Sequence, residues 1–328
     1  MGESVIQVPR DREGEFEPIV VPKHQSRGLS IERLVISLYA KGMSVADIES
    51  EMQEIYGINL STSAISIITN KVSQAATEWQ NRPLDSLYMI VWMDGIVFKV
   101  RENGKVINKT VYLCVGLNKE GLKEVLGMWI GKNESAAFWM GVLTDLKARG
   151  VEDILITVTD NLNGFTETIK SVFPASTTQI CVVHQIRNSC RYVVWKEKKE
   201  FTADLKNIYN APTKEAAEME LDNFEQKWGA KYPYAIRSWR NNWEELTVFF
   251  DFPVEIRKII YTTNLIENLN GKIRKYTKNK LSFPNDDALK KSVYLAINEI
   301  EKKWYQPIWN WALIFNQFIT IFENRIQV

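Results

Sequence analysis

The stretch 87-LYMIVWMDG-95 is a run of seven apolar residues that ends in an aspartate and a glycine. A near-continuous apolar run of this length, bounded by a turn-forming pair, is typical of a buried β-strand. The stretch 152-EDILITVTDN-161 has the same form and ends in Asp160. We therefore expect Asp94 and Asp160 each to follow a buried strand.

The segments around these two strands predict the rest of a sheet. They are a hairpin over 96–117 with its turn at 102–105, a strand over 122–131, a helix over 134–149, a helix over 164–173 and a strand over 178–183. The predicted order is βββαβαβ, which is that of an α/β, RNase H-like fold with a mixed sheet flanked by helices. In this order the ends of the first and fourth strands can meet at one edge of the sheet.

A third acidic residue, Glu267, lies in 261-YTTNLIENLNGKIRKYTKNK-280, which predicts an amphipathic helix. Glu267 falls outside the apolar stripe of this helix. The cations that follow it are Lys272, Arg274, Lys275, Lys278 and Lys280. A carboxylate followed by cations fits metal binding beside a DNA backbone, and three carboxylates from distant segments can hold two Mg²⁺ or Mn²⁺ ions.

Each acidic residue also has an ordinary structural interpretation. Asp94 precedes Gly95 and fits a turn, Asp160 precedes a predicted helix and fits an N-cap, and Glu267 fits a solvated ion pair with a lysine. We favour the metal-binding interpretation because all three residues occur together with the predicted strand order.

The N-terminal part divides into an extended connector over 1–28, with one strand at Ser4–Val8, and a helical module over 29–82. Ser30, Ser44 and Ser61 are predicted to begin three short helices, as in a helix-turn-helix module. The third helix is expected to present short polar side chains to phosphates and base edges. These are Thr62, Ser63, Ser66, Thr69, Asn70 and Lys71. The alternative is a small helical packing domain.

The sheet is predicted to occupy 84–183, and a tryptophan-rich helical segment follows over 184–255. Arg237 and Arg240 could grip DNA by charge, with stacking from Trp239 and Trp243, although these aromatic residues also fit a core. Residues 256–300 are expected to contribute the catalytic helix that closes the RNase H-like core. A C-terminal helix is expected over 301–328.

Composition is that of a globular protein and is uninformative about nucleic acid, because 41 basic and 40 acidic residues give a net charge of +1. The three cysteines, Cys114, Cys181 and Cys190, are an odd number and predict a reducing compartment without structural disulfides. No apolar run reaches the ~20 residues of a membrane helix, so we expect a cytoplasmic protein without membrane contact.

Several multi-residue stretches resemble the mutator-type transposases of bacterial insertion sequences. They include WQNRPLDSLYMIVWMDG (79–95), FWMGVLTDLKARGVEDILI (138–156), CVVHQIRNSCRYV (181–193) and FPVEIRKIIYTTNLIENLNGKIRK (252–275). The resemblance runs from about Val8 to the C-terminus. It implies a DDE transposase on an RNase H-like fold, with Asp94, Asp160 and Glu267 as the triad that binds two Mg²⁺ or Mn²⁺ ions for DNA cleavage and strand transfer.

The resemblance also implies the partners of the protein, while two other functions remain as alternatives. The partners are transposon-end DNA with terminal inverted repeats, target DNA and further copies of the chain in a homo-oligomer such as a dimer on DNA, associated with the bacterial nucleoid. Relatives carry a further N-terminal region, so the resemblance implies a chain that lacks it. The rival functions are a catalytically silent DNA-binding remnant and an RNase H-like nuclease that cuts without joining.

In the mutator-type family a Cys-x-x-His pair follows the second aspartate, and Cys181 and His184 match it, so both are expected near the active site. One Cys-His pair supplies only half of the four ligands of a structural zinc site, and neither Cys190 nor His24 is a convincing further ligand. We favour His184 as a hydrogen-bonding or DNA-contacting group over a zinc ligand.

Overall fold

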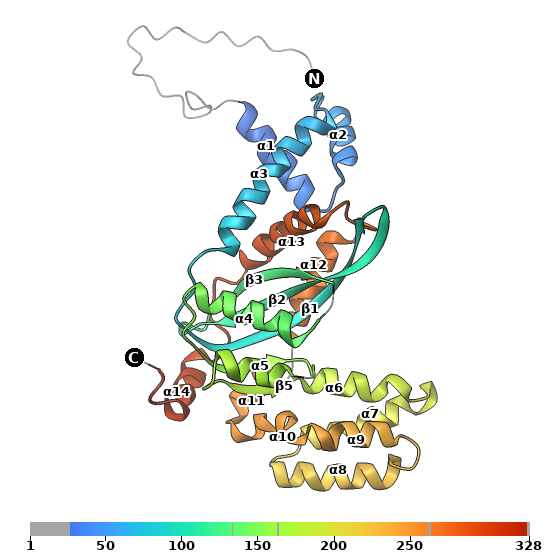
Figure 1. Cartoon of the computed structure of the whole chain (residues 1–328), viewed down its shortest axis with the longest axis vertical. Helices are drawn as coiled ribbons and strands as arrows, with labels where there is room; N and C mark the ends of the chain where they lie inside the picture. The colour runs from blue at the N-terminus through green and yellow to red at the C-terminus, as the bar shows by residue number, and fades with distance from the viewer. Residues whose placement is uncertain (1–26, 133, 163, 262–263, 327–328) are drawn as a thin grey trace.

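The computed structural model describes residues 27–132, 134–162, 164–261 and 264–326. The strand predicted at Ser4–Val8 and the connector up to residue 26 lie outside these ranges. The described residues form a mixed α/β protein in which a five-stranded sheet lies between helical layers (Figure 1).

The sheet has the strand order β3-β2-β1-β4-β5. Its strands are β1 (Leu87–Glu102), β2 (Lys105–Leu117), β3 (Lys123–Gly131), β4 (Asp153–Thr159) and β5 (Thr177–Ile180). The first three pair antiparallel, whereas β4 pairs parallel with β1 and β5 parallel with β4. The βββαβαβ order of the prediction is confirmed, and this mixed sheet is compatible with an RNase H-like core.

Strand β1 is longer than predicted and does not end at Asp94. Asp94 and Gly95 stay in the antiparallel ladder with β2, opposite Leu113 and Tyr112, and the strand continues to Glu102. The hairpin turns at Asn103 and Gly104, whose φ angles of 49° and 76° fit a two-residue turn with left-handed positions. The turn interpretation of the Asp94-Gly95 pair is therefore wrong.

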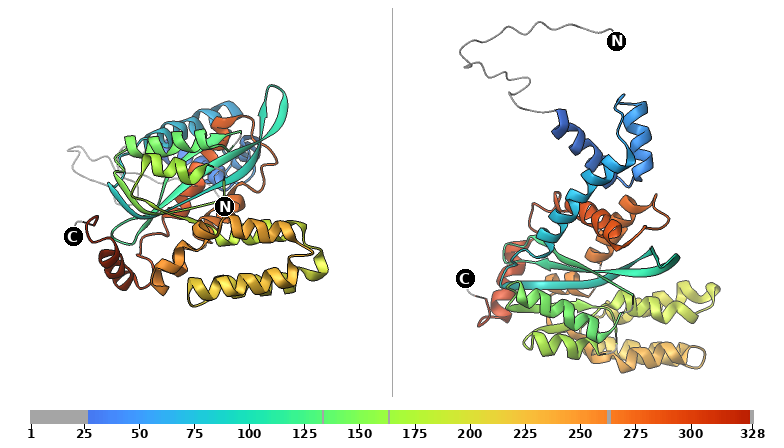
Figure 2. Two further views of the ribbon diagram at one scale, coloured as in Figure 1. Left: turned by 60° about the horizontal axis from the view of Figure 1, so that its bottom comes forward. Right: turned by 45° about the horizontal axis from the view of Figure 1, so that its top comes forward.

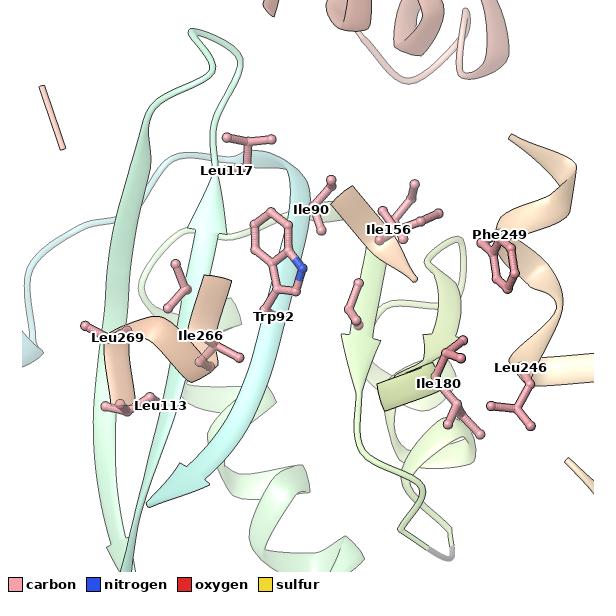
Figure 3. Packing of buried hydrophobic residues seen from close by; sticks show 14 of the residues in the cluster. Ile90, Trp92, Leu113, Leu117, Ile156, Ile180, Leu246, Phe249, Ile266 and Leu269 are labelled. Atoms are coloured by element: carbon pink, nitrogen blue, oxygen red, sulfur yellow. The ribbon is translucent and has the colours of Figure 1, made fainter. Parts of the chain in front are cut away.

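Helices cover both faces of the sheet. On one face lie α12 (Asn264–Thr277) and α13 (Asp286–Glu301), and on the other lie α4 (Ala136–Ala148) and α5 (Phe165–Val172). Trp92 of β1 is in the same buried cluster as Ile266 and Leu269 of α12 (Figure 3). This packing seats α12 against the strand that carries Asp94.

The N-terminal helices form a cluster with a core of its own. They are α1 (Arg27–Ala40), α2 (Val45–Glu54) and α3 (Thr62–Gln80). Ser44 and Ser61 are N-caps as predicted, but Ser30 is not, because α1 already begins at Arg27. Residues 55–61 connect α2 and α3, which is longer than the turn of three or four residues in a typical helix-turn-helix. The helix-turn-helix assignment stays a prediction.

A helical layer follows the sheet in sequence and lies beside it (Figure 2). Its α-helices are α6 (Val182–Ser189), α7 (Lys198–Tyr209), α8 (Lys214–Trp228), α9 (Pro233–Asn241), α10 (Trp243–Leu246) and α11 (Val254–Ile260). The strand predicted over 178–183 is present as β5, but its predicted end is wrong, since β5 ends at Ile180 and α6 begins at Val182. Helix α14 (Trp311–Ile321) lies near the C-terminus.

Two tryptophans of this helical layer are core residues and do not stack on DNA. Trp239 is 1% exposed and Trp243 is 8% exposed, and both belong to the main apolar cluster. The indole Nε1 of Trp239 donates a hydrogen bond to Ser189 Oγ at 2.9 Å. The stacking role predicted for Trp239 and Trp243 is therefore wrong.

In the described part of the chain, none of the three cysteines forms a disulfide. Within the described ranges, no helix combines the length and the apolar character needed to cross a membrane.

Candidate active site

The parallel pairing of β1 with β4 brings Asp94 and Asp160 together. The pairing ends at Trp92 opposite Val158, and each aspartate lies two residues beyond its member of this pair. Because side chains alternate along a strand, both aspartates point to the face that Trp92 and Val158 occupy. This is the face covered by α12.

A compact group of possible metal ligands results from this register. Ligand atoms of Asp94, Asp160 and His184 all lie within 4.8 Å of one another. Asp94 comes from β1, Asp160 follows β4, and His184 lies on the first turn of α6. Three segments that are distant in sequence thus contribute to one acidic centre.

The Asp94 carboxylate is 9% exposed and accepts two hydrogen bonds. Its Oδ1 accepts from the backbone N–H of Gly95 and its Oδ2 from Nδ2 of Asn270, both at 2.7 Å. Burial and the nearby charge of Asp160 raise the pKa of Asp94 to about 7. Asn270 was not predicted, although its position three residues after Glu267 on one helix was a usable signal.

His184 is paired with the second aspartate. Its Nδ1 lies 2.5 Å from Oδ1 of Asp160. Burial lowers the pKa of His184, but hydrogen bonds to Asp160 and Cys181 outweigh burial and raise the pKa to about 11. Cys181 is the N-cap residue of α6, and its backbone N–H donates to the carbonyl of Thr159, next to Asp160, at 2.8 Å. The hydrogen-bonding role that we favoured for His184 stays a prediction.

Glu267 lies at the edge of this group and is held by an arginine. Arg187 of α6 donates from Nη1 to Oε1 at 2.6 Å and from Nη2 to Oε2 at 2.8 Å. Oε1 of Glu267 is also 3.7 Å from His184 Nε2. The compact group is thus two aspartates and a histidine, with the third acidic residue in a bidentate ion pair. Arg187 was not predicted, although it follows His184 by three residues.

The polar residues predicted to contact DNA on α3 have different environments. Ser63 is exposed and Ser66 is partly exposed, whereas Thr69 is 2% exposed and so cannot be on the outward face. Asn70 accepts a hydrogen bond from Lys291 of α13 at 3.0 Å. One side of α3 is therefore occupied by α13, and the DNA-contact role of Ser63, Ser66 and Asn70 stays a prediction.

The basic residues predicted to contact DNA also differ. Arg237 is exposed, whereas Arg240 is ion-paired with Asp222 and Glu225 of α8. Three further predicted contacts lie exposed on α12, and they are Lys272, Arg274 and Lys275. The charge of Arg240 is thus already balanced within the protein, unlike that of the α12 cations.

The acidic centre is consistent with divalent metal binding. Ligand atoms of two carboxylates lie together, and burial followed by the charge of Asp160 raises the pKa of Asp94, so the ionised form of Asp94 is disfavoured when no cation is near. A divalent cation favours the ionised form, and carboxylate oxygens are the ligands that Mg²⁺ uses in proteins. The donor set therefore fits such an ion.

The family model described as "Transposase, Mutator family" matches residues 1–307, so the chain belongs to this family. The chain is therefore a DNA transposase.

Relatives with known names are transposases of insertion sequences. The chain is 43% identical to the probable transposase for insertion sequence element ISRM3-like of Sinorhizobium fredii, over 98% of this chain and 80% of the relative. It is 40% identical to a probable insertion-sequence transposase of Corynebacterium diphtheriae, over 90% of this chain and 87% of the relative. The transposase for insertion sequence element IS256 in transposon Tn4001 of Staphylococcus aureus is 27% identical, over 93% of this chain and 78% of the relative.

Among solved structures, a chain of the simian T-cell lymphotropic virus intasome in complex with PP2A regulatory subunit B56 gamma aligns with 61% of this chain and 68% of its own length. The identity is 15% and the TM-score is 0.23, which is too low to support a shared fold.

Proposed function

We propose that this transposase cleaves and joins DNA by metal-dependent phosphoryl transfer of the DDE type, on an RNase H-like core. Asp94, Asp160 and Glu267 are the residues that hold two Mg²⁺ or Mn²⁺ ions. The observation that carries the proposal is the convergence of Asp94 and Asp160 at the end of the parallel β1–β4 pairing. When bound, these ions supply Lewis-acid stabilisation of the attacking and departing oxygens.

Three neighbouring residues position the acidic ones. Asn270 donates to Asp94 and keeps one of its oxygens directed toward α12. His184 contacts Asp160 through Nδ1, and Arg187 holds both oxygens of Glu267. Because α6 carries His184 and Arg187, this helix determines where two of the three acidic side chains lie.

The remaining assignments belong to the same proposal. The substrates are transposon-end DNA with terminal inverted repeats and target DNA, and the chain acts as a homo-oligomer, such as a dimer, on the DNA of the bacterial cytoplasm. The helices of 29–82 are a DNA-binding module of the helix-turn-helix type, and 184–255 are an all-α insertion before the catalytic helix of 256–300. Family membership and the helical content of these segments support these assignments.

The test is joining of a labelled duplex, with a free 3′-hydroxyl at the transposon end, to a plasmid in Mg²⁺ or Mn²⁺. The wild type is compared with Asp160→Asn and Glu267→Gln, and with Asp251→Asn as an exposed control outside the centre. We expect joining by the wild type and the control, and background levels with the other two. Cleavage without joining would favour a nuclease, and DNA binding without either reaction would favour a silent remnant.

A further inference from the structure

A groove of about 500 Å³ lies between the distal part of β1 and the C-terminal half of α12. It is lined by four cationic side chains, which are those of Lys99, Arg274, Lys278 and Lys280. Among the described residues that line it, none is acidic. In Figure 1 the β1–β2 hairpin projects beyond the rest of the sheet on the side where α12 and α13 lie.

The walls of this groove are held together by main-chain contacts. The segment after α12 returns to β1, where the N–H of Phe283 donates to the carbonyl of Lys99 and the N–H of Arg101 donates to the carbonyl of Phe283, both at 2.8 Å. The rings of Phe98 and Phe283 pack edge to face with centroids 5.8 Å apart. These contacts fix the position of the segment after α12 against β1. The cations of the groove therefore lie on two segments that are held together.

Within the described ranges, the groove cations have no ion pair of the kind found elsewhere on the same hairpin. Lys109 of β2 pairs with Glu102 at 2.9 Å and with Asp286 at 2.7 Å. Lys280 instead donates to Ser292 Oγ at 2.8 Å and lies 3.9 Å from the ring centroid of Tyr39. Burial and the nearby charge of Lys291 lower the pKa of Lys280 to about 8. A set of cations without carboxylates is suited to an anionic ligand from outside the chain.

The groove is aligned with the acidic centre along one stripe of α12. Glu267, Gly271 and Arg274 are spaced by three or four residues, which places them on the same side of the helix, and Lys278 follows directly after its end. Gly271 is exposed, and a Cβ added there would meet nothing within 4 Å. Glycine inside a helix costs about 0.5–1 kcal/mol relative to alanine, and here it leaves the helix backbone open between the centre and the cations.

The distance from the centre to the groove fits a DNA strand. Arg274 follows Glu267 by seven residues, which is about 10 Å along a helix. Val97 lines the groove and follows Asp94 by three residues, which is also about 10 Å along a strand. Successive phosphates of one strand of B-DNA advance by about 3.4 Å along the axis, so about three nucleotides span this distance.

We propose that this groove binds the phosphate backbone of the reacting DNA about three nucleotides from the phosphate at the acidic centre. Lys99, Arg274, Lys278 and Lys280 are its phosphate contacts. The proposal rests on the proposed function, in that the acidic centre acts on DNA. It assigns to β1 a DNA contact, through Lys99, in addition to the exposed cations of α12.

The test measures DNA binding as a function of salt, in EDTA, for the full chain with an intact acidic centre. The triple variant Lys99→Gln, Arg274→Gln, Lys278→Gln is compared with a control that removes the same charge from exposed lysines of α5 and α7. The control triple is Lys170→Gln, Lys199→Gln, Lys206→Gln. We expect the slope of log Kobs against log salt to fall in magnitude by about 0.9 for each lost phosphate contact, and to change little in the control.

Two probes distinguish the source of the DNA. One is a fluorescein-labelled linear duplex of arbitrary sequence with free 3′-hydroxyl ends, and the other is a covalently closed plasmid. A reduced slope on the duplex alone assigns the groove to DNA with a free 3′-hydroxyl end. A reduced slope on the plasmid alone assigns it to continuous DNA such as the target, and a reduced slope on both assigns it to a path that the two share. Equal slopes for the two triple variants, or a wild type that binds neither probe, would overturn the proposal.

This measurement is independent of the reaction itself. If the groove variant shows the reduced slope but the wild type joins no DNA, the groove proposal stands and the proposed chemistry fails. If joining succeeds and the slopes are equal, the chemistry stands and the groove proposal fails.

Discussion

The two halves of α12 differ in the charge that they present. The first turn carries Glu267, with Asn270 one turn further on beside Asp94, so this half faces the acidic centre. The second half presents Lys272, Arg274 and Lys275, and Lys278 follows directly after the helix. A helix macrodipole favours this polarity, because anions are stabilised near the N-terminus of a helix and cations near its C-terminus.

This difference shows why the net charge of +1 was uninformative. Acidic and basic residues nearly cancel in the sum, but the fold places an anionic centre and a cationic groove about 10 Å apart along one helix. In the proposed function, a metal ion offsets the charge of the first half, and DNA phosphates offset the charge of the second half. The following experiments address these two halves separately.

The largest effect is expected from Mg²⁺ on the stability of the protein. The folded-state pKa of Asp94 is raised to about 7, above its usual value near 4, so the metal-free protein loses stability as pH rises from about 4 to about 7. Mg²⁺ at a hundredfold excess over its Kd should stabilise the protein by about 2.7 kcal/mol. Thermal unfolding should show this gain fully above pH 7 and much less at pH 5, where Asp94 is protonated.

The matched variants for this experiment are Asp160→Asn and Asp251→Asn. The first removes a carboxylate of the centre and should lose the Mg²⁺-dependent rise in Tm, whereas the second lies outside the centre and should keep it. An equal rise in both variants would show that Mg²⁺ stabilises the protein elsewhere.

The next prediction concerns Arg187, which should affect strand joining through Glu267 in the first half of α12. Arg187→Gln removes both hydrogen bonds to the Glu267 carboxylate and should reduce strand joining about 10- to 100-fold, which is about 1.4–2.7 kcal/mol. Arg187→Lys should retain part of the activity, and Arg191→Gln, exposed just after α6, should retain all of it. Faster joining by Arg187→Gln would instead mean that Arg187 restrains Glu267.

The smallest effect on stability and DNA binding is expected at Gly271, where the two halves of α12 meet. Gly271→Ala should stabilise the DNA-free protein by about 0.5–1 kcal/mol, because alanine is favoured inside a helix and the added Cβ meets no neighbour. The same change should weaken DNA binding if the backbone at Gly271 is approached by DNA. Gly141 of α4 is also exposed with nothing near its added Cβ, so Gly141→Ala should stabilise equally and leave DNA binding unchanged.

Chemical denaturation and DNA titration of these two alanine variants measure both quantities. If Gly271→Ala binds DNA as tightly as Gly141→Ala does, the helix backbone at 271 is not part of the DNA path.

Local patterns predicted much of the fold. Apolar runs indicated the buried strands, Asn103-Gly104 supplied a turn with two left-handed positions, and Ser44 and Ser61 were recognised as N-caps. These features depend on residues a few positions apart, so they are readable without the tertiary structure. The same local reasoning misplaced the end of β1 at Asp94, because only the ladder with β2 keeps the Asp-Gly pair extended.

The amino-acid sequence by itself determined the order of strands and helices along the chain, the three acidic residues and the resemblance to the family to which the chain belongs. Only the tertiary structure decided which side chains meet. Asn270 reaches Asp94 across 176 residues, Arg187 reaches Glu267 across 80, and the groove joins β1 to the end of α12. Such contacts depend on the register of strands and the seating of a helix, which arise from packing of the whole core and leave no periodic signal in the chain.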